Sequence, residues 1–525
     1  MKNLLIIMLC FVASQCLRAQ NQVPEINNLV VFADSVNHQL SISFDLADPD
    51  SESVFISAHL SDNEGETFLV QAAFYGDIGL TTETNETKTI YWDYFASIPN
   101  IEEYRVKIVA DDLYEIDIQE IVDLVSQENL TTDLNTIVGV RHYNANPENL
   151  QNTKDYIMGV FEGNGLQTST HNFEYNNNYD GQNLIGKQTG VEDETATIII
   201  DAHYDTVANS PGADDNGTGT VGFLESARVL SQFNFKKNIK FIGFDLEEVG
   251  LVGSKEFVAN GIDDYETIEA VLNYEMIGYY DADPNTQSIP FGFDILFPEA
   301  TEEIAAADNA GIFLINVGNT FSSWLSATYD SCATLYVPQL PVVTINAPGN
   351  GEVTQDLRRS DHASFWDEGI NALMLTDGAD TRNPYYHTAQ DGIDKINFEF
   401  MTNIVKATVA TAAVLAEPSH SKVAIGNVSF DNSTWAEQID GLKQKVYVSP
   451  NPNSGAFNVL LRNKVDLGTT VEIVGTNGQL IAEKSIGTKG KKVSFNLQNL
   501  ASGLYFVKVN LPNGQPLVEK ITVGR

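Results

Sequence analysis

Histidine and carboxylate side chains that follow apolar segments are the residues of this chain best suited to chemistry. The segment "IIIDAHYDTV" ends an apolar run at His203 and places Asp205 two residues later. Open strand ends are where α/β sheets carry their sites, and a nearby carboxylate can fix the tautomer of a metal-binding histidine. The pair suits metal binding, although by itself it is more typical of a polar loop.

Two adjacent acids follow a second apolar run, in "FIGFDLEEVGLVGS". Near a buried strand end, the carboxylates of Glu247 and Glu248 would repel each other and lose hydration unless a cation faced both. With a metal present, one acid can bind it while its neighbour takes a proton from the activated water. An ordinary solvated acid pair in a strand-to-loop connection is the alternative.

Three further segments complete the set of candidates. "GADDNGTG" carries Asp214 and Asp215 ahead of a helical pattern, where aspartate is also a common N-cap. Glu275 follows an apolar run in "AVLNYEMIG", and "YYHTAQD" carries Tyr386 and His387. Each segment alone is more often structural, but their joint order along one domain predicts a metal centre.

Six motifs in this order resemble those of the co-catalytic zinc aminopeptidases of metallopeptidase family twenty-eight: "HYDTV", "GADDNGTG", "LEEVGLVGS", "NYEMIG", "SDHASFW" and "YYHTAQD". The resemblance covers most of residues 126–416. It implies a three-layer α/β/α domain with a mixed, partly parallel sheet that holds zinc, two ions per chain. It also implies an exopeptidase that hydrolyses N-terminal residues from peptides or proteins.

The resemblance assigns the metal ligands residue by residue. Asp215 would bridge both ions. His203 and Glu275 would complete one site, and Glu248 and His387 would complete the other. The secreted bacterial relatives usually have aspartate where this chain has Glu275, so the occupancy of the second metal is left open.

The neighbours of these ligands would serve the reaction. Glu247 would act as the general base, Asp205 would hold the ring of His203, and Tyr386 would donate to the oxyanion. Two further residues would support the site without binding metal, Asp361 and His362. The segment 279–359 would shape the specificity pocket, and its phenylalanines and leucines suit an apolar first residue of the substrate as well as they suit a core.

Four segments of different character are expected to position these residues. Residues 21–125 contain short alternating runs such as "QLSISFDLAD", which predict a β-sandwich of immunoglobulin or fibronectin type. Residues 126–416 alternate capped helical segments with buried strands, as an α/β layered domain does. Residues 417–443 are polar without strong periodicity, which predicts a linker, and residues 444–525 again alternate short strands and turns.

The first twenty residues have the pattern of a cleaved export signal. An early lysine precedes the apolar run Leu4–Val12, which is shorter than the roughly 20 residues that span a bilayer. A buried helix or membrane anchor is the alternative. Two of the three cysteines lie in this segment, so the mature chain would retain only Cys332 and could form no internal disulfide. Export without disulfides fits a bacterium.

The C-terminal block resembles a second family. "SPNPNSG", "NGQLI", "LASGLYFVKV" and "EKITVGR" are similar to the C-terminal sorting domain of the type IX secretion system of Bacteroidetes. Residues 441–525 hold 11 basic and 4 acidic residues, whereas the whole chain has a net charge of -41. The resemblance implies passage through the periplasm and across the outer membrane of a Gram-negative bacterium, by way of its secretion machinery. A generic β-sandwich appendage, such as a carbohydrate-binding module, is the alternative.

The composition and the motifs together rank the possible functions of the chain. An excess of 71 acidic over 30 basic residues disfavours nucleic acid as a partner. A secreted zinc aminopeptidase is the leading hypothesis. A glutaminyl-cyclase-like acyltransferase, a carboxypeptidase or a dipeptidase on the same fold are alternatives, and a non-catalytic adhesin or binding ectodomain is the alternative from another class.

Overall fold

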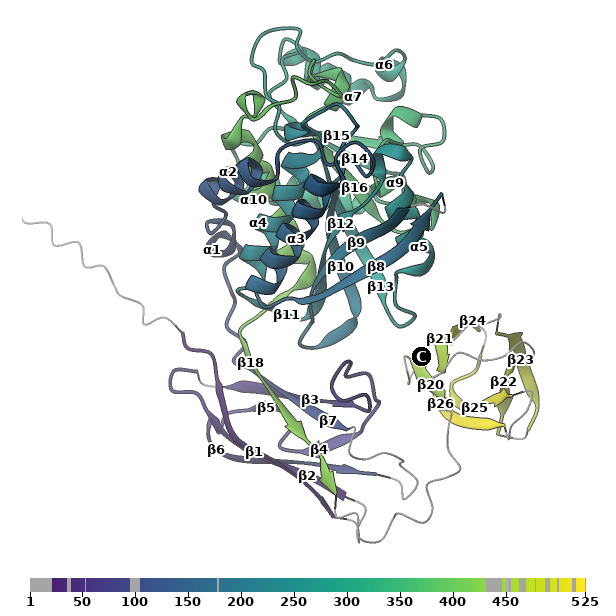
Figure 1. Cartoon of the computed structure of the whole chain (residues 1–525). Coiled ribbons are helices and arrows are strands. Elements are labelled where there is room, and N and C mark those ends of the chain that lie inside the picture. The colour runs from purple at the N-terminus through teal and green to yellow at the C-terminus, as the bar shows by residue number, and fades with distance from the viewer. Residues whose placement is uncertain are drawn as a thin grey trace, which may run out of the picture. The chain divides into compact units, whose positions relative to one another are not determined.

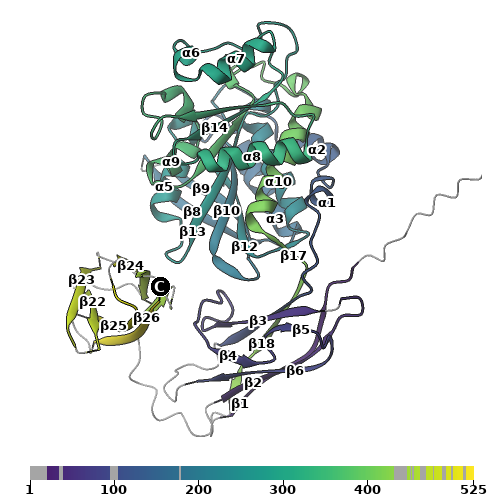
Figure 2. The same cartoon turned by 180° about the vertical axis from the view of Figure 1, so that it is seen from behind.

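The computed structural model describes residues 21–430 with short gaps, and the strands of the C-terminal part (Figures 1 and 2). The gaps are residues 35–38, 52, 95–103 and 177–178. Beyond residue 430 the described residues are 446–449, 451, 455–461, 469–476, 478–486, 492–497, 500–511 and 516–524. The predicted signal peptide, residues 1–20, and residues 431–443 of the predicted linker lie outside the described residues.

The N-terminal part forms two sheets around one core. The first sheet has the order β19-β1-β2-β6-β4, and the second has the order β18-β7-β3-β5. Along β2 every second residue is buried, as a strand with one solvent-facing side requires. The bounds are β1 (Glu25–Asp34), β2 (Gln39–Ala47), β3 (Val54–Ser61), β4 (Phe74–Gly76), β5 (Gly79–Thr81), β6 (Asn85–Asp93), β7 (Arg105–Asp111), β18 (Ser421–Asn427) and β19 (Ser429–Phe430).

The beginning of the predicted linker belongs to this N-terminal part. β18 pairs antiparallel with β7 over seven residues, from Ser421 opposite Asp111 to Asn427 opposite Arg105. The linker prediction is therefore wrong for residues 421–427. The segment SKVAIGN is short and has no regular alternation of apolar and polar residues, so the sequence does not predict a strand there. The strand forms because pairing satisfies the backbone groups along the open edge of β7.

An eight-stranded mixed sheet forms the centre of the α/β domain, in the order β15-β14-β16-β13-β10-β12-β9-β8. β16, β13, β10 and β12 run parallel to one another, and β9 and β8 pair antiparallel beside β12. At the other side β14 pairs antiparallel with β16 and parallel with β15. The bounds are β8 (Gln167–Tyr175), β9 (Tyr179–Gln188), β10 (Asp193–His203), β12 (Lys237–Phe244), β13 (Thr267–Glu275), β14 (Leu314–Asn319), β15 (Val342–Ala347) and β16 (Ala372–Thr376). A two-residue pair, β11 (Asn234–Phe235) and β17 (Pro418–Ser419), lies outside this sheet.

Helices cover both faces of this sheet (Figures 1 and 2). Ile198 and Ile200 of β10 pack into the core on one face, and Ile199 packs into the core on the other. The first face is covered by α1 (Ile118–Val122), α2 (Gln127–Ile137), α3 (Pro147–Gly163), α4 (Gly219–Leu230), α8 (Ser323–Tyr336) and α10 (Phe398–Ala416). The second is covered by α5 (Val252–Asn260), α6 (Phe293–Leu296), α7 (Pro298–Ala306) and α9 (His362–Asp367). The predicted α/β/α fold class is confirmed.

Short helical turns stand between these elements and carry several of the site residues. They are Ala213–Thr218, Glu247–Val249, Gln355–Arg358, Ala379–Thr381 and Ile393–Lys395. Several long helices begin at side-chain caps that the sequence contains. The side chain of Asn397, for example, accepts a hydrogen bond from the backbone N–H of Phe400 at the start of α10.

The described C-terminal residues form a three-stranded and a four-stranded sheet, as the sequence predicts. The first has the order β20-β21-β24 and the second the order β23-β22-β25-β26. A core that includes Val459, Ile473 and Val507 draws residues from both. The bounds are β20 (Val446–Ser449), β21 (Ala456–Leu461), β22 (Thr470–Gly475), β23 (Leu480–Ser485), β24 (Lys492–Asn496), β25 (Gly503–Asn510) and β26 (Leu517–Val523).

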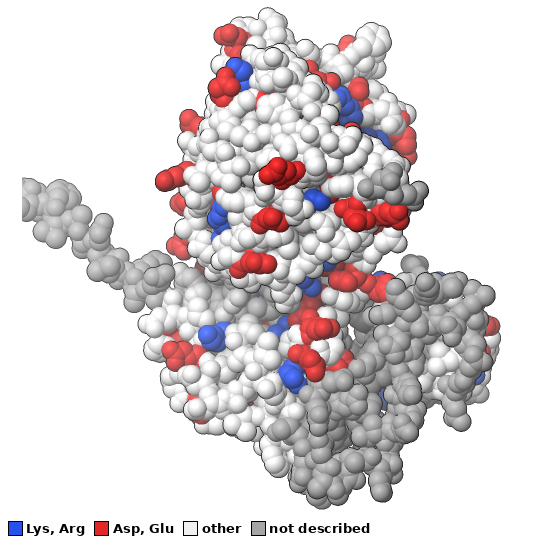
Figure 3. All heavy atoms as spheres, viewed as in Figure 1, with Lys and Arg blue, Asp and Glu red and all other residues white. Residues whose placement is uncertain are grey.

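Two further features are the distribution of acidic side chains on the surface and the burial of the longest helix, α10. Acidic side chains, red in Figure 3, are spread over the visible face rather than gathered in one patch. Within the described residues, α10 is the one helix long and apolar enough to cross a membrane, but 67% of its most apolar window is buried. That burial is typical of a core helix.

Candidate metal centre

Neighbouring parallel strands bring the predicted site residues to one edge of the sheet. β10 ends at His203 and β13 ends at Glu275, while β12 leads into the turn that carries Glu247. Because parallel strands end at the same edge, their terminal side chains meet there. Asp215 comes from the irregular turn before α4, and His387 comes from the loop after β16.

One group of possible ligands surrounds Nε2 of His203, a residue that is 1% exposed. Glu275 Oε2 lies 3.3 Å from this nitrogen, Asp215 Oδ1 lies 3.6 Å away and Glu247 Oε2 lies 3.9 Å away. Ligand atoms of His203, Glu247 and Glu275 lie within 4.8 Å of one another. These atoms are close enough to share one ion.

A second group surrounds Nε2 of His387. This nitrogen lies 3.0 Å from Asp215 Oδ2 and 3.1 Å from Glu248 Oε2. Ligand atoms of these three residues also lie within 4.8 Å of one another. Asp215 thus faces both groups, with one oxygen toward His203 and the other toward His387. All five residues predicted as ligands come together in the structure.

The carboxylate of Asp205 connects the histidine to the two adjacent glutamates. Its Oδ1 lies 3.4 Å from His203 Nδ1 and accepts a hydrogen bond from the backbone N–H of Glu247 at 3.1 Å. Its Oδ2 accepts from the backbone N–H of Glu248 at 3.4 Å. Because Nδ1 of His203 faces Asp205, Nε2 is the nitrogen that faces the ligand cluster.

Asp391 anchors the turn that carries Asp215. Its two carboxylate oxygens accept hydrogen bonds from the backbone N–H groups of Asp214 and Asp215, at 3.0 and 3.2 Å. In the sequence it is only one more acid after His387. The Oγ of Ser360 similarly donates to Glu275 Oε2 at 2.7 Å. This contact helps to hold the carboxylate of Glu275 in place.

Arg141 is a site residue that no sequence pattern indicates. Its guanidinium is fully buried and donates to five backbone carbonyls, those of Ile137, Gly139, Tyr204, Pro211 and Gly212. Burial lowers the pKa of Arg141 to about 10, against the opposing effect of Asp391 and Asp205. It holds the backbone on either side of the site, and a lone arginine in "VGVRHYN" gives no sign of this.

Asp361 and His362 are buried near the site but are not among its two ligand groups. The Nε2 of His362 lies 2.9 Å from the carbonyl oxygen of Leu357, and its ring packs edge-on against Trp366 at 4.5 Å. Burial lowers the pKa of His362 to about 4, so this ring is neutral. A supporting role for His362 stays a prediction.

The site concentrates negative charge in a buried space. Burial raises the pKa of Glu247 well above its ordinary value, and burial together with Asp215 raises that of Glu248 to about 7. Burial by itself would lower the pKa of His387, but hydrogen bonds to Asp215 and Glu248 raise it to about 10. Crowded carboxylates with two imidazole nitrogens are a donor set suited to zinc, whose charge would relieve the repulsion.

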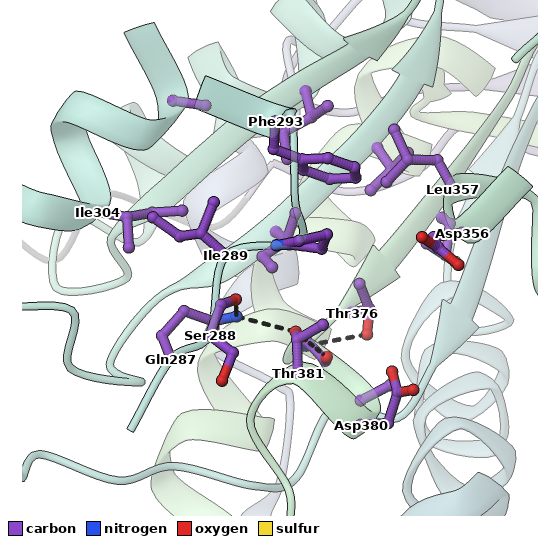
Figure 4. Close-up of a pocket in the computed structure, with 18 of the residues that line it drawn as sticks. Gln287, Ser288, Ile289, Phe293, Ile304, Asp356, Leu357, Thr376, Asp380 and Thr381 are labelled. Carbon is purple, nitrogen blue, oxygen red and sulfur yellow. Dashed lines mark hydrogen bonds between the residues drawn. The ribbon is translucent and has the colours of Figure 1, made fainter. Parts of the chain in front are cut away.

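A pocket of about 360 Å³ opens beside Glu275 (Figure 4). Most of its wall is apolar, and Tyr386, Arg359 and Asp380 also line it. Arg359 donates to the Tyr386 hydroxyl at 3.0 Å and pairs with Asp380 at 2.9 Å. The apolar lining residues include Ile289, Phe293, Phe297, Ile304, Ile315, Val317, Ile345, Leu357 and Met374. Much of this wall comes from the segment predicted to shape specificity.

Comparison with known proteins finds two family matches in the chain. Residues 183–412 match peptidase family M28, and residues 445–524 match the secretion system C-terminal sorting domain. The uncharacterized protein YfbL of Escherichia coli is 28% identical over 275 residues, which are 50% of this chain and 80% of that protein. Aminopeptidase YwaD of Bacillus subtilis is 28% identical over 242 residues, 45% of each chain. The crystal structure of the Legionella pneumophila LapA aminopeptidase is 26% identical, with a TM-score of 0.45, and the match covers 58% of this chain and 74% of that chain.

Proposed function

Because the chain contains a peptidase family M28 domain and a secretion system C-terminal sorting domain, we propose that it is a secreted zinc aminopeptidase that removes apolar N-terminal residues from peptides. The observation that carries this proposal is the pair of ligand groups that meet at Asp215. Two groups that share one carboxylate can hold two ions side by side, which a peptidase of this type uses.

The proposed ligands are His203 and Glu275 for one ion, Glu248 and His387 for the other, and Asp215 for both. When bound, the two ions would polarise a water and the scissile carbonyl and stabilise the charge that develops on the oxyanion. Ser360 keeps the carboxylate of Glu275 in place. Asp205 and Asp391 do the same for His203 and for the turn that carries Asp215.

Glu247 is the proposed general base. Its side chain is 12% exposed and reaches the ligand cluster, with one oxygen 3.9 Å from His203 Nε2. The backbone N–H of Glu247 donates a hydrogen bond to Asp205. This bond fixes the position of the backbone from which the Glu247 side chain extends. The carboxylate would accept a proton from the attacking water and deliver it to the amine that leaves.

Tyr386 is proposed to donate to the oxyanion. Its hydroxyl accepts a hydrogen bond from Arg359, which leaves the hydroxyl's own proton available for another acceptor. The ring stacks on His387 with centroids 3.8 Å apart, so the phenol stands next to the second ligand group. Arg359 therefore acts on the reaction by positioning Tyr386.

The pocket beside Glu275 supports an apolar first residue of the substrate. Figure 4 shows Ile289, Phe293 and Leu357 around the same space, with Thr376 and Thr381 on another side. Burying an aliphatic or aromatic side chain in such a wall is worth about 1.5–3 kcal/mol. The Glu275 carboxylate at the pocket wall could attract the free α-ammonium group of that residue.

The C-terminal sorting domain supports secretion or display at the cell surface. We propose the route through the periplasm and outer membrane of a Gram-negative bacterium, with outer-membrane secretion machinery as the partner of this domain. The substrates would then be peptides or protein N-termini outside the cell.

Product analysis by mass spectrometry tests the proposal. The zinc-loaded chain would be incubated with matched peptides that begin with Leu or Gln and have free or acetylated N-termini. Stepwise loss of residues from free peptides only is the expected result. Loss of ammonia from the Gln peptide would identify a cyclase, and release from the C-terminus would identify a carboxypeptidase. A chain that changes none of these peptides would fit a binding ectodomain instead.

A further inference from the structure

The outward face of the five-stranded sheet in the N-terminal sandwich carries a row of aromatic side chains. Phe32 of β1 pairs with Ser41 of β2, Ser41 pairs with Tyr91 of β6, and Tyr91 pairs with Tyr75 of β4. Residues that face each other across neighbouring strands point to the same side of the sheet. Because strands lie about 4.8 Å apart, this line crosses about 14 Å of the face.

Two of the three rings in the row are exposed to solvent, and the third, Tyr91, is half-buried. Phe32 is 61% exposed and Tyr75 is 42% exposed, whereas the inward residues of the same sheet, such as Leu40 and Ile42, are fully buried. The rings of Tyr75 and Tyr91 lie 5.6 Å apart and within 29° of parallel. Large exposed side chains gathered in one line, with polar groups beside them, commonly mark a binding surface.

Polar groups stand beside the rings in a fixed arrangement. Gln39 Nε2 donates to the Tyr75 hydroxyl at 2.8 Å and to Asp93 Oδ1 at 3.1 Å. The Tyr75 hydroxyl in turn donates to Asp93 Oδ1 at 2.9 Å. Ser43 and Thr89, which face each other on the same side, add hydroxyl groups along the opposite flank of the row. The face therefore combines exposed aromatic rings with amide, carboxylate and hydroxyl groups.

We propose that this face binds a carbohydrate chain. The C–H faces of sugar rings pack on aromatic rings, while the sugar hydroxyls exchange hydrogen bonds with side chains such as Gln39 and Asp93. A line of rings across neighbouring strands suits an extended chain of several sugars. The proposal is independent of the peptidase function, because every residue in it belongs to the sandwich.

A protein partner or a second copy of the chain fits this face less well. The cores of protein interfaces are continuous apolar surfaces depleted of charge. Here Ser41 interrupts the aromatic row, and the exposed carboxylate of Asp93 stands at its side. Sugars tolerate both features because they offer hydroxyl groups to them.

The test measures the binding of the full chain to polysaccharides. Affinity gel electrophoresis would use soluble β-glucan, xylan and starch, and pull-down would use insoluble cellulose and chitin. We expect at least one to bind the wild type. The double variant Tyr75→Ala/Tyr91→Ala should lower its affinity at least about tenfold, as truncation of central aromatic residues does.

A matched control separates this effect from general damage. Phe55 is 41% exposed on β3 of the other sheet, so Phe55→Ala should leave carbohydrate binding unchanged. All three proteins should have the same thermal midpoint and the same activity on a short peptide. The proposal is overturned if the wild type binds none of the polysaccharides, or if the double variant binds like the wild type. A wild-type dimer that the double variant abolishes would also overturn it, in favour of a second copy as the occupant.

Discussion

Replacing Glu247 with Gln tests the proposed reaction most directly. Glutamine has nearly the shape of glutamate, so it should fit the same space, and the backbone contact from this position to Asp205 does not depend on the side chain. What the change removes is the ability to accept a proton. The variant should therefore fold and bind zinc like the wild type, with very little turnover.

The expected loss follows from the role assigned to the residue. General base catalysis contributes about 10²–10⁴-fold to a rate, which corresponds to about 3–5 kcal/mol of transition-state stabilisation. Because Glu247 is not one of the proposed ligands, this loss should fall on kcat while KM changes little. The adjacent acid gives the matched control. Glu248→Gln removes a carboxylate that lies 3.1 Å from His387 Nε2, so it should weaken zinc binding first.

Two measurements separate the variants. Steady-state kinetics on a Leu peptide gives kcat and KM, and titration of the metal-free proteins with zinc gives the number of ions and their affinities. The wild type and Glu247→Gln should each bind two ions, whereas Glu248→Gln should bind one of them more weakly. The base assignment is refuted if Glu247→Gln retains the kcat of the wild type, or if its only defect is lost zinc.

The other predictions concern the supports, the pocket and the metal-free protein. Asp205→Ala should weaken zinc binding about 10–100-fold in the same titration, because the ring of His203 loses its partner. Phe293→Ser should lower kcat/KM for a Leu peptide at least about tenfold, and much less for an Ala peptide, since it removes apolar contact from the pocket. In the metal-free chain, burial raises the pKa of Glu248 to about 7 and that of Asp391 to about 6. At these two carboxyl groups the folded state binds more protons than the unfolded state, which outweighs the opposite effect of the single buried His362, so stability should fall as the pH rises from about 4 to 7. Calorimetry across that range checks this, and zinc should flatten the slope; a flat profile without zinc would contradict it.

Much of the site could be predicted because its residues follow strands that the sequence marks clearly. The apolar runs before His203, Glu247 and Glu275 identify buried parallel strands, and parallel strands must end at one edge. The motif order then supplies His387 and Asp215. The position of each residue directly after an apolar run indicates which strand end carries it. The parallel sheet then brings these strand ends close together.

The contacts that hold these residues could not be predicted in the same way. Arg141 lies far from the ligands in sequence and donates to backbone carbonyls. Every residue type has a backbone carbonyl, so the sequence does not show which ones Arg141 contacts. Ser360 stands within a recognisable motif, but its bond to Glu275 depends on how the chain returns to the sheet edge. The strand Ser421–Asn427 cannot be predicted from its own residues, because its register is set by β7, about three hundred residues earlier.

That late strand makes the α/β domain an insertion within the sandwich. The chain leaves the sandwich after β7, builds the whole α/β domain, and returns to complete the same sheet with β18. Until residues 421–427 have been synthesised, β7 has no partner on that side, and the sandwich has an unpaired sheet edge. A truncation near residue 125 would separate β7 from its partner instead of dividing two modules. A single protease cut between β7 and α1 would leave the two fragments joined through the paired strands β7 and β18. The fragments would separate only after denaturation.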